Sequence, residues 1–163
     1  MNPVNYSYIP VSIAIFLQLI FPYWRNLYCI NTWITPPFYV CLAIFLGVYA
    51  IFGVLLWKSY EIDNMEIFGL TWGLIAINLI WLYTYKSHKK YSLLLLFVSL
   101  LLGYFTYNAI FLSDLTKTEV ANSNTLYLNL FSIYIVWIGL MITILIESSD
   151  PLEFKKRKMI SKK

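Results

Sequence analysis

The chain has very little of what enzymes use for acid–base or metal chemistry. Its 163 residues include one histidine, two cysteines and eight acidic residues, and charged residues make up only 12%. A bis-histidine haem site therefore cannot form within one chain. A histidine-based metal site or a serine–histidine hydrolase would have only His88, which lies among lysines. We expect no metal site and no catalytic residues, so the sequence favours a protein that is not an enzyme.

Carboxylates and thiols add no chemistry. Glu61, Asp63 and Glu66 fall between two apolar runs, where we expect a connecting loop. Because no carboxylate lies deep within an apolar run, a carboxylate-based proton pump is disfavoured. Cys29 and Cys41 lack the C-x-x-C spacing of a redox or zinc site, and we interpret both as free thiols.

What the chain has in abundance is apolar sequence. Hydrophobic residues make up 60% of it and aromatic residues 19%. A helix needs about 20 apolar residues to cross a bilayer core about 30 Å thick. Five runs approach that length, at residues 7–21, 38–57, 67–85, 91–112 and 125–146. We therefore predict an all-α integral membrane protein, with one five-helix transmembrane domain over residues 1–163, a retained first helix and a basic tail at 147–163.

The basic residues predict the orientation of these spans. With five spans, the first and third connecting segments and the C-terminal tail share one side of the membrane. They carry ten of the twelve basic residues. Because lysine and arginine are retained on the cytosolic side, we expect a cytosolic C-terminus and a non-cytosolic N-terminus. The sequence does not indicate which membrane holds the protein.

A run of four basic residues stands out in the tail. It consists of Lys155, Lys156, Arg157 and Lys158. Such a run can contact anionic lipid head groups, with each charge contributing about 1 kcal/mol near the surface, or it can act only as a topology determinant. Either way, we expect the lipid bilayer to be the partner of this surface, and not nucleic acid.

The third run carries a polar residue among apolar ones. Asn78 and Trp81 are three residues apart and so share a helix face, with Tyr85 one turn further along. Because an amide in hydrocarbon needs hydrogen-bond partners, we expect this face to point into the protein. There Asn78 either clamps the bundle through an interhelical hydrogen bond or contacts a ligand.

The last run carries a second stripe of large side chains. Tyr127, Tyr134, Trp137 and Met141 recur at spacings of seven, three and four residues, which places them on one helix face. Stripes of this kind usually form the core of a bundle. An aromatic face with hydroxyl and indole N–H groups also suits a flat, mostly apolar ligand.

Small residues predict close helix contacts. Ser99 and Gly103 are four residues apart in the fourth run, and Gly47 and Gly53 lie in the second run. Small side chains allow the backbones of membrane helices to approach each other. We expect both pairs to lie at helix–helix interfaces.

Four short segments share a pattern of tryptophan, tyrosine, asparagine and proline. Trp33 precedes a proline pair at 36–37, just before the second run. Tyr49 and Gly53 follow in that run, and Phe45 lies four residues before Tyr49. The segment Ala76-Ile77-Asn78-Leu79-Ile80-Trp81 lies in the third run and Tyr134-Ile135-Val136-Trp137 in the fifth.

In order and spacing, these segments resemble the tryptophan-rich sensory protein family, also called translocator protein or peripheral benzodiazepine receptor. The family patterns are K-P-x-W-x-P-P before helix 2, W-x-x-L-Y-x-x-M-G in helix 2, A-L-N-x-x-W in helix 3 and P-Y-x-x-W in helix 5. Here the Lys-Pro is absent, Phe45 replaces the first tryptophan of the helix 2 pattern, and Ile133 replaces the proline of the helix 5 pattern.

The resemblance implies a five-helix bundle with a ligand pocket beneath the first loop. Family members bind porphyrins, haem-type tetrapyrroles, cholesterol or other sterols, and aromatic drugs, and they need no resident cofactor. The residues that match the pocket are Trp33, Tyr49, Asn78, Trp81, Tyr134 and Trp137. The resemblance implies that Trp33 lies over the pocket mouth. Phe45 argues against the photochemical porphyrin degradation proposed for some members, which uses a tryptophan at this position.

Two functions remain open from the sequence. One is a receptor or transporter that binds a tetrapyrrole or a sterol. The other is a structural or assembly protein whose aromatic stripes only pack helices. Monomer and homodimer are both compatible with the sequence.

Overall fold

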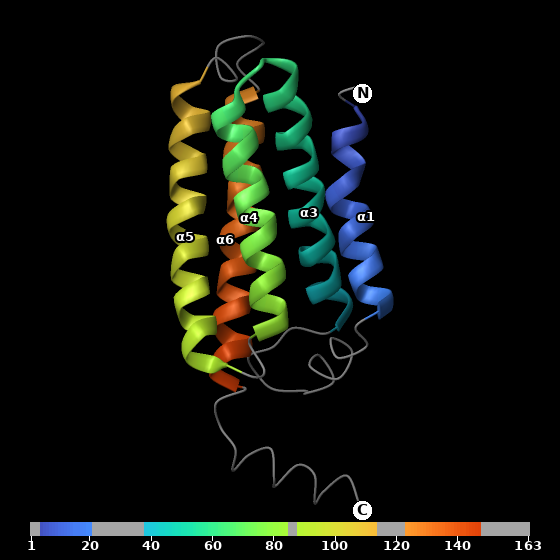
Figure 1. The fold of residues 1–163 in the computed structure, drawn as a ribbon, viewed down its shortest axis with the longest axis vertical. Coiled ribbons are helices and arrows are strands. Elements are labelled where there is room, and N and C mark those ends of the chain that lie inside the picture. The colour runs from blue at the N-terminus through green and yellow to red at the C-terminus, as the bar shows by residue number, and fades with distance from the viewer. Residues whose placement is uncertain (1–3, 21–37, 85–87, 114–122, 148–163) are drawn as a thin grey trace, which may run out of the picture.

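The structure is a computed structural model, which describes residues 4–20, 38–84, 88–113 and 123–147. These residues form five α-helices that run side by side along the long axis of the molecule (Figure 1). They are α1 (Asn5–Ile20), α3 (Phe38–Glu61), α4 (Met65–Thr84), α5 (Lys89–Leu112) and α6 (Ser123–Glu147). Each helix coincides with one of the five predicted apolar runs to within a few residues, so the all-α prediction is confirmed.

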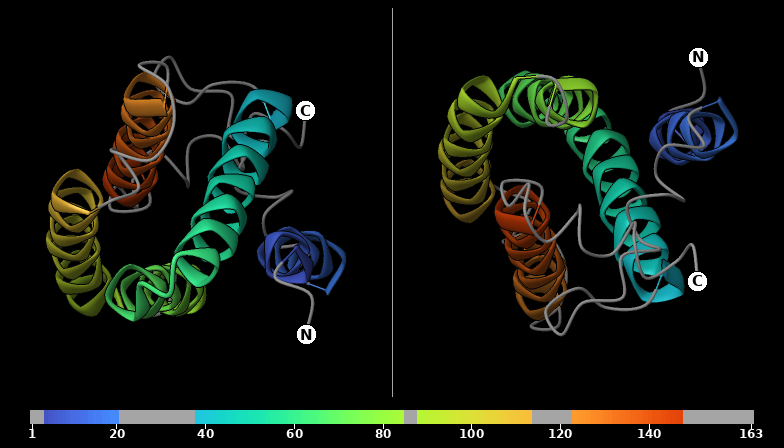
Figure 2. Two further views of the ribbon diagram at one scale, coloured as in Figure 1. Left: turned by 90° about the horizontal axis from the view of Figure 1, so that it is seen from above. Right: turned by 90° about the horizontal axis from the view of Figure 1, so that it is seen from below.

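Four of the helices form a ring and the fifth lies outside it. α3 packs against α4, α4 against α5 and α5 against α6, and α6 returns to α3 (Figure 2). α1 packs along the outer face of α3, away from the interior of the ring. The ring therefore encloses one core, to which α3, α4, α5 and α6 all contribute.

Apolar and aromatic side chains fill this core. The largest fully buried side chains of the described residues are Trp81, Trp137, Tyr49, Phe45, Phe52, Leu56, Ile67, Leu74, Ile75, Met141, Val48 and Asn78. Asn78 is the polar member of that set. The prediction that Asn78 and Trp81 face the interior is confirmed, because both are at most 1% exposed.

The outer faces of the bundle are also apolar. Large exposed side chains on α4 and α5 include Tyr83, Leu93, Phe97, Tyr104 and Phe111. A helix that is hydrophobic all round is typical of a buried or membrane-spanning segment. By length and composition, α3, α4 and α5 are long and apolar enough to cross a membrane.

The two remaining helices are shorter in their apolar part. Over the side chains that the structure describes, the apolar stretches of α1 and α6 are Asn5–Leu17 and Phe131–Leu145. The described part of the chain therefore has the composition of a multi-pass membrane protein, with three helices long enough to span.

The turn between α3 and α4 is tighter than the sequence predicts. Both helices continue into the expected loop, so that Glu61 ends α3 and Glu66 lies in the first turn of α4. Asn64 makes this start possible, because its Oδ1 accepts a hydrogen bond from the backbone N–H of Ile67 at 3.1 Å. Asp63 has φ 56°, a left-handed conformation that lets the chain reverse.

Two buried threonine hydroxyls are satisfied within their own helices. Thr71 Oγ1 donates to the carbonyl of Ile67 and Thr106 Oγ1 to that of Leu102, both at 2.7 Å. Such bonds leave no unpaired hydroxyl towards hydrocarbon, where an unpaired polar group is costly.

The predicted close contacts form at two of the three predicted glycines. A side chain at Gly53 would collide with the backbone carbonyl of Ser7 in α1, and a Cβ at Gly103 would lie 2.6 Å from Tyr134 Cε1 in α6. Gly47 also lies at a helix–helix contact, where a Cβ would meet Ile133 Cγ2 of α6 at an ordinary 3.9 Å. The helices are therefore less tightly packed at Gly47 than at Gly53.

Candidate ligand-binding site

A hydrogen bond joins two predicted site residues across the ring. The indole Nε1 of Trp137 in α6 donates to Asn78 Oδ1 in α4 at 3.0 Å. Asn78 Nδ2 donates in turn to the carbonyl of Leu74, one turn earlier in α4, at 2.8 Å. Both Asn78 and Trp137 are fully buried. The amide therefore uses both of its polar atoms while it links helices that are far apart in the sequence.

A second polar contact links α6 to α5. The Tyr134 hydroxyl lies 2.6 Å from Ser99 Oγ, and it donates to the carbonyl of Ser99 at 2.9 Å. Gly103 lies one turn further along α5, and its missing side chain leaves room for the Tyr134 ring. The small residues predicted as a packing pair thus admit a tyrosine and bind its hydroxyl. Asn78 also interacts with the Tyr134 side chain.

Tyr49 differs from these residues, because its hydroxyl is buried without a partner. The side chain is 0% exposed, and among the described residues its hydroxyl has no hydrogen-bond partner. Buried polar groups in folded proteins are nearly always hydrogen-bonded, so an exception requires an explanation. A bound molecule with a hydrogen-bonding group is one such explanation, and an ordered water is another.

Aromatic rings connect Tyr49 to the α6 stripe. The Phe45 ring lies 4.7 Å from the Tyr49 ring and 5.2 Å from that of Trp137, centroid to centroid. On the other side, Phe52 lies 5.7 Å from Tyr49 and 6.0 Å from Tyr134. These separations fall within the range of favourable aromatic pairs. Phe45 and Phe52 therefore hold Tyr49 beside the two hydrogen-bonded residues of α6.

Most of the predicted site residues lie close together in the structure. One buried core contains four of them, Tyr49, Trp81, Tyr134 and Trp137. Asn78 is joined to this core by its hydrogen bond to Trp137. The structure thus brings five of the six predicted residues together, from α3, α4 and α6.

Four sequence predictions fall outside what the structure describes. Trp33, predicted to cover the pocket mouth, lies outside the described residues, as do Tyr85 and the side chain of Tyr127. The basic run at residues 155–158 lies outside them as well. These four stay predictions.

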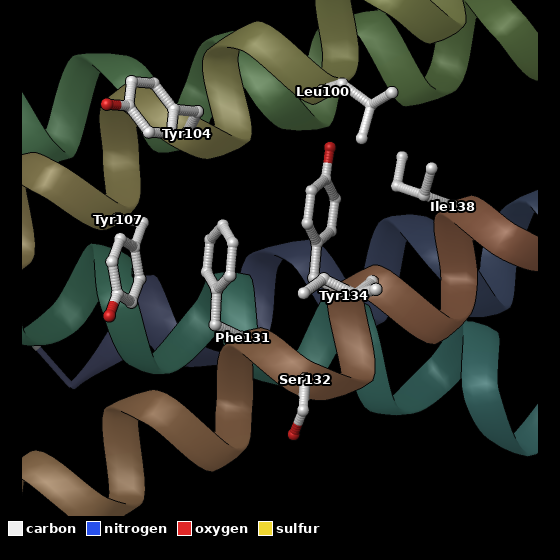
Figure 3. A pocket seen from close by; sticks show the side chains of 8 residues that line it. Leu100, Tyr104, Tyr107, Phe131, Ser132, Tyr134 and Ile138 are labelled. Atoms are coloured by element: carbon white, nitrogen blue, oxygen red, sulfur yellow. The ribbon is translucent and has the colours of Figure 1, made fainter.

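An open groove lies between α5 and α6, and Tyr134 is one of the residues that line it. It has a volume of about 430 Å³. It is lined by Leu100, Tyr104, Tyr107, Phe131, Ser132, Tyr134, Ile135 and Ile138. Phe131 and Tyr134 project from α6 towards α5, whereas Ser132 points away (Figure 3).

Sequence reasoning missed several of these contributions. Phe45 and Phe52 were not expected to frame the site, although both lie in the second apolar run beside Tyr49. The groove residues Tyr104 and Tyr107 are three apart in α5, a spacing that could have identified them. Ser99 was expected only to allow close packing, and not to bind a hydroxyl.

The site contains no charge. Among the described residues, the buried polar side chains are Ser59, Thr71, Asn78, Ser92, Ser99, Thr106 and Ser113, and none of them is ionisable at neutral pH. No three His, Cys, Asp or Glu side chains of that part of the chain lie close enough to hold a metal ion. The arrangement provides uncharged, largely apolar surroundings with a neutral hydrogen-bonding group, the Tyr49 hydroxyl.

The fold and site define an all-α helical bundle with membrane-compatible helices and an aromatic, uncharged interior. Comparisons with protein-family models, with curated proteins and with solved structures give no match to this chain. The resemblance to the tryptophan-rich sensory protein family therefore rests only on the residues quoted for it, and it stays a prediction.

Proposed function

We propose that this chain is a five-span membrane protein with a non-cytosolic N-terminus and a cytosolic C-terminus. The apolar outer faces of α4 and α5 and the apolar length of α3, α4 and α5 support the spanning helices. The distribution of lysine and arginine supports the orientation. α6, which is part of the ring, and α1, which packs against α3, would then cross the membrane with these three helices.

We further propose that the protein is a receptor or transporter for a flat, hydrophobic small molecule, of the tetrapyrrole or sterol class. The observation that carries this proposal is the buried, unpartnered hydroxyl of Tyr49 beside Phe45 and Trp137. Leaving a buried hydroxyl unpaired costs about 1–3 kcal/mol. A ligand that accepts its hydrogen bond removes that cost when it binds.

Convergence of the predicted residues supports the same proposal. Tyr49, Trp81 and Trp137 come from three different helices, yet all are buried in one core. Ligand sites in proteins are usually lined by apolar and aromatic side chains with a few polar groups that fix the orientation of the ligand. The Tyr49 hydroxyl is a polar group of that kind here.

A second candidate function is that of a structural or assembly protein. The hydrogen bond between Trp137 and Asn78 favours it, because each group is already satisfied by the other. In this alternative, the aromatic side chains only hold the helices together. The two candidates make opposite predictions for ligand-induced stabilisation.

The test is to titrate the purified protein with protoporphyrin and, separately, with a sterol, while recording tryptophan fluorescence and the melting temperature. A ligand that binds only the folded state at 100 times its Kd raises the stability by about 2.7 kcal/mol. We expect saturable quenching and a raised melting temperature with at least one of the two ligands.

Two tryptophan variants distinguish quenching by a ligand bound in the core from non-specific quenching of tryptophan fluorescence. A variant with both Trp81→Leu and Trp137→Leu should abolish saturable quenching, because both tryptophans of the buried core are lost. Trp57→Leu is the matched control, since Trp57 is half-buried near the opposite end of α3, under the Lys58 ammonium. If no tetrapyrrole or sterol raises the melting temperature of the native chain, the receptor proposal is wrong and the structural candidate stands.

A further inference from the structure

The interior of the ring lacks any group that could balance a charge. None of the buried polar side chains of the described residues is a lysine, arginine, histidine or carboxylate. Lys58 lies near the end of α3, where it pairs with Glu61 at 2.8 Å, and Lys90 is exposed at the start of α5. An ionised group that entered the core would therefore lose its hydration and find no counter-charge, which is strongly unfavourable.

Among the described residues, the interior offers instead a neutral hydroxyl for recognition. The hydroxyls of Tyr134 and Ser99 bind each other, and the Asn78 amide binds Leu74 and Trp137. The Tyr49 hydroxyl remains, fully buried and without a partner in the described part of the chain. A phenol can donate one hydrogen bond, so it matches one acceptor atom on a ligand.

We propose that the site selects an uncharged, flat apolar molecule that carries one hydrogen-bond acceptor, such as a ketone or hydroxyl oxygen, bound by the Tyr49 hydroxyl. The same chemistry rejects a tetrapyrrole whose two carboxylates are ionised. This inference rests on the proposed function and narrows its ligand class. It also assigns the specificity to Tyr49, whose ring is held in place by Phe45 and Phe52.

The first experiment compares two ligands that differ only in charge. Protoporphyrin IX and its dimethyl ester are titrated into the full-length protein in lipid nanodiscs, with empty nanodiscs as the control for partitioning. We expect the uncharged ester to bind at least about tenfold more tightly than the diacid, because burial of an unpaired carboxylate is the larger cost. Equal or tighter binding of the diacid overturns the inference.

The second experiment compares two ligands that differ only in one acceptor. Cholestan-3-one and cholestane share the same rings, and only the ketone can accept a hydrogen bond. We expect the native chain to prefer the ketone by about threefold to tenfold, the effect of one hydrogen bond. Tyr49→Phe should abolish that preference while it leaves cholestane binding unchanged. Tyr134→Phe is the matched control, and it should retain the preference because its hydroxyl is occupied by Ser99.

The outcomes separate the inference from the function on which it rests. If a ligand binds saturably but Tyr49→Phe keeps the ketone preference, the role of Tyr49 is wrong and a receptor remains. If none of the four molecules binds, the proposed function fails and this inference fails with it. An ordered water on Tyr49 corresponds to the first of these results.

Discussion

Trp137 and Asn78 form a hydrogen bond across the ring, from the indole Nε1 to the amide Oδ1 at 3.0 Å, and both side chains are fully buried. The bond joins α6 to α4, two helices that are not consecutive in the sequence. Loss of either side chain therefore leaves a buried polar atom of the other without this hydrogen bond.

Removal of either partner should lower the stability of the protein. Trp137→Phe leaves Asn78 Oδ1 buried without a donor, and we expect a loss of about 1–3 kcal/mol. Asn78→Leu removes the acceptor and leaves the indole N–H unpaired. In the double variant the losses should not add, with a coupling of about 0.6–1.7 kcal/mol, the range found for hydrogen bonds between membrane helices. Thermal unfolding in detergent measures all three, and strictly additive losses would contradict the bond.

Two tyrosines in one core should respond in opposite ways to loss of the hydroxyl. Tyr49→Phe removes a buried, unpaired group, so we expect the ligand-free protein to gain up to about 1 kcal/mol. Tyr134→Phe removes the bonds to the Ser99 hydroxyl and carbonyl, and we expect a loss of about 1–2 kcal/mol. The melting temperatures of the two variants, compared side by side, check this. Equal destabilisation by both changes would show that the Tyr49 hydroxyl has a partner.

Glycine substitutions should separate close helix contacts from open positions. Gly53→Ala pushes a methyl group against the Ser7 backbone, which cannot rotate away, so α1 must move from α3 at a cost of about 1–3 kcal/mol. Gly69→Ala and Gly139→Ala are the controls, because no atom would lie within 4 Å of the new Cβ. Alanine favours the helix at these positions by about 1 kcal/mol. A similar melting temperature for all three variants would contradict the tight α1–α3 contact.

Opposite ends of the bundle should face opposite sides of the membrane. Asp63 lies in the turn between α3 and α4, and His88 precedes α5 at the other end. In a Cys29→Ser background, we expect Asp63→Cys to react with a membrane-impermeant maleimide in intact cells. His88→Cys should react only after lysis, because the lysines beside it favour the cytosol. Cys41 is buried and should stay unlabelled. Labelling of both positions in intact cells would argue against a spanning bundle.

The sequence predicts the helices of this protein well and their partners less well. Apolar runs are sufficient to locate all five helices, because each is long and bounded by polar residues. The ends were misjudged at Glu61 and Glu66, since hydropathy does not register the cap that Asn64 forms. Local capping therefore extended two helices beyond their apolar parts.

The inward faces were predictable where a polar residue or an aromatic stripe marked them, as on α4 and α6. Asn78 had to face the interior, and the structure confirms this. On helices that are apolar on every side, periodicity cannot tell the core from the outside, because lipid and core are equally apolar. For that reason Phe45 and Phe52 could not be assigned to the site from the sequence. The return of α6 to α3 joins residues far apart in the chain, and the periodicity of a single helix contains no information about it.

The position of α6 has a consequence for biosynthesis. The bonds of Asn78 to Trp137 and of Ser99 to Tyr134 both need α6, which emerges from the ribosome after α4 and α5. Until then the Asn78 amide oxygen and the Ser99 carbonyl lack the donors that α6 supplies. A chain that stops translation before α6 would present these groups to the quality-control machinery of the membrane, and we expect such a product to be degraded.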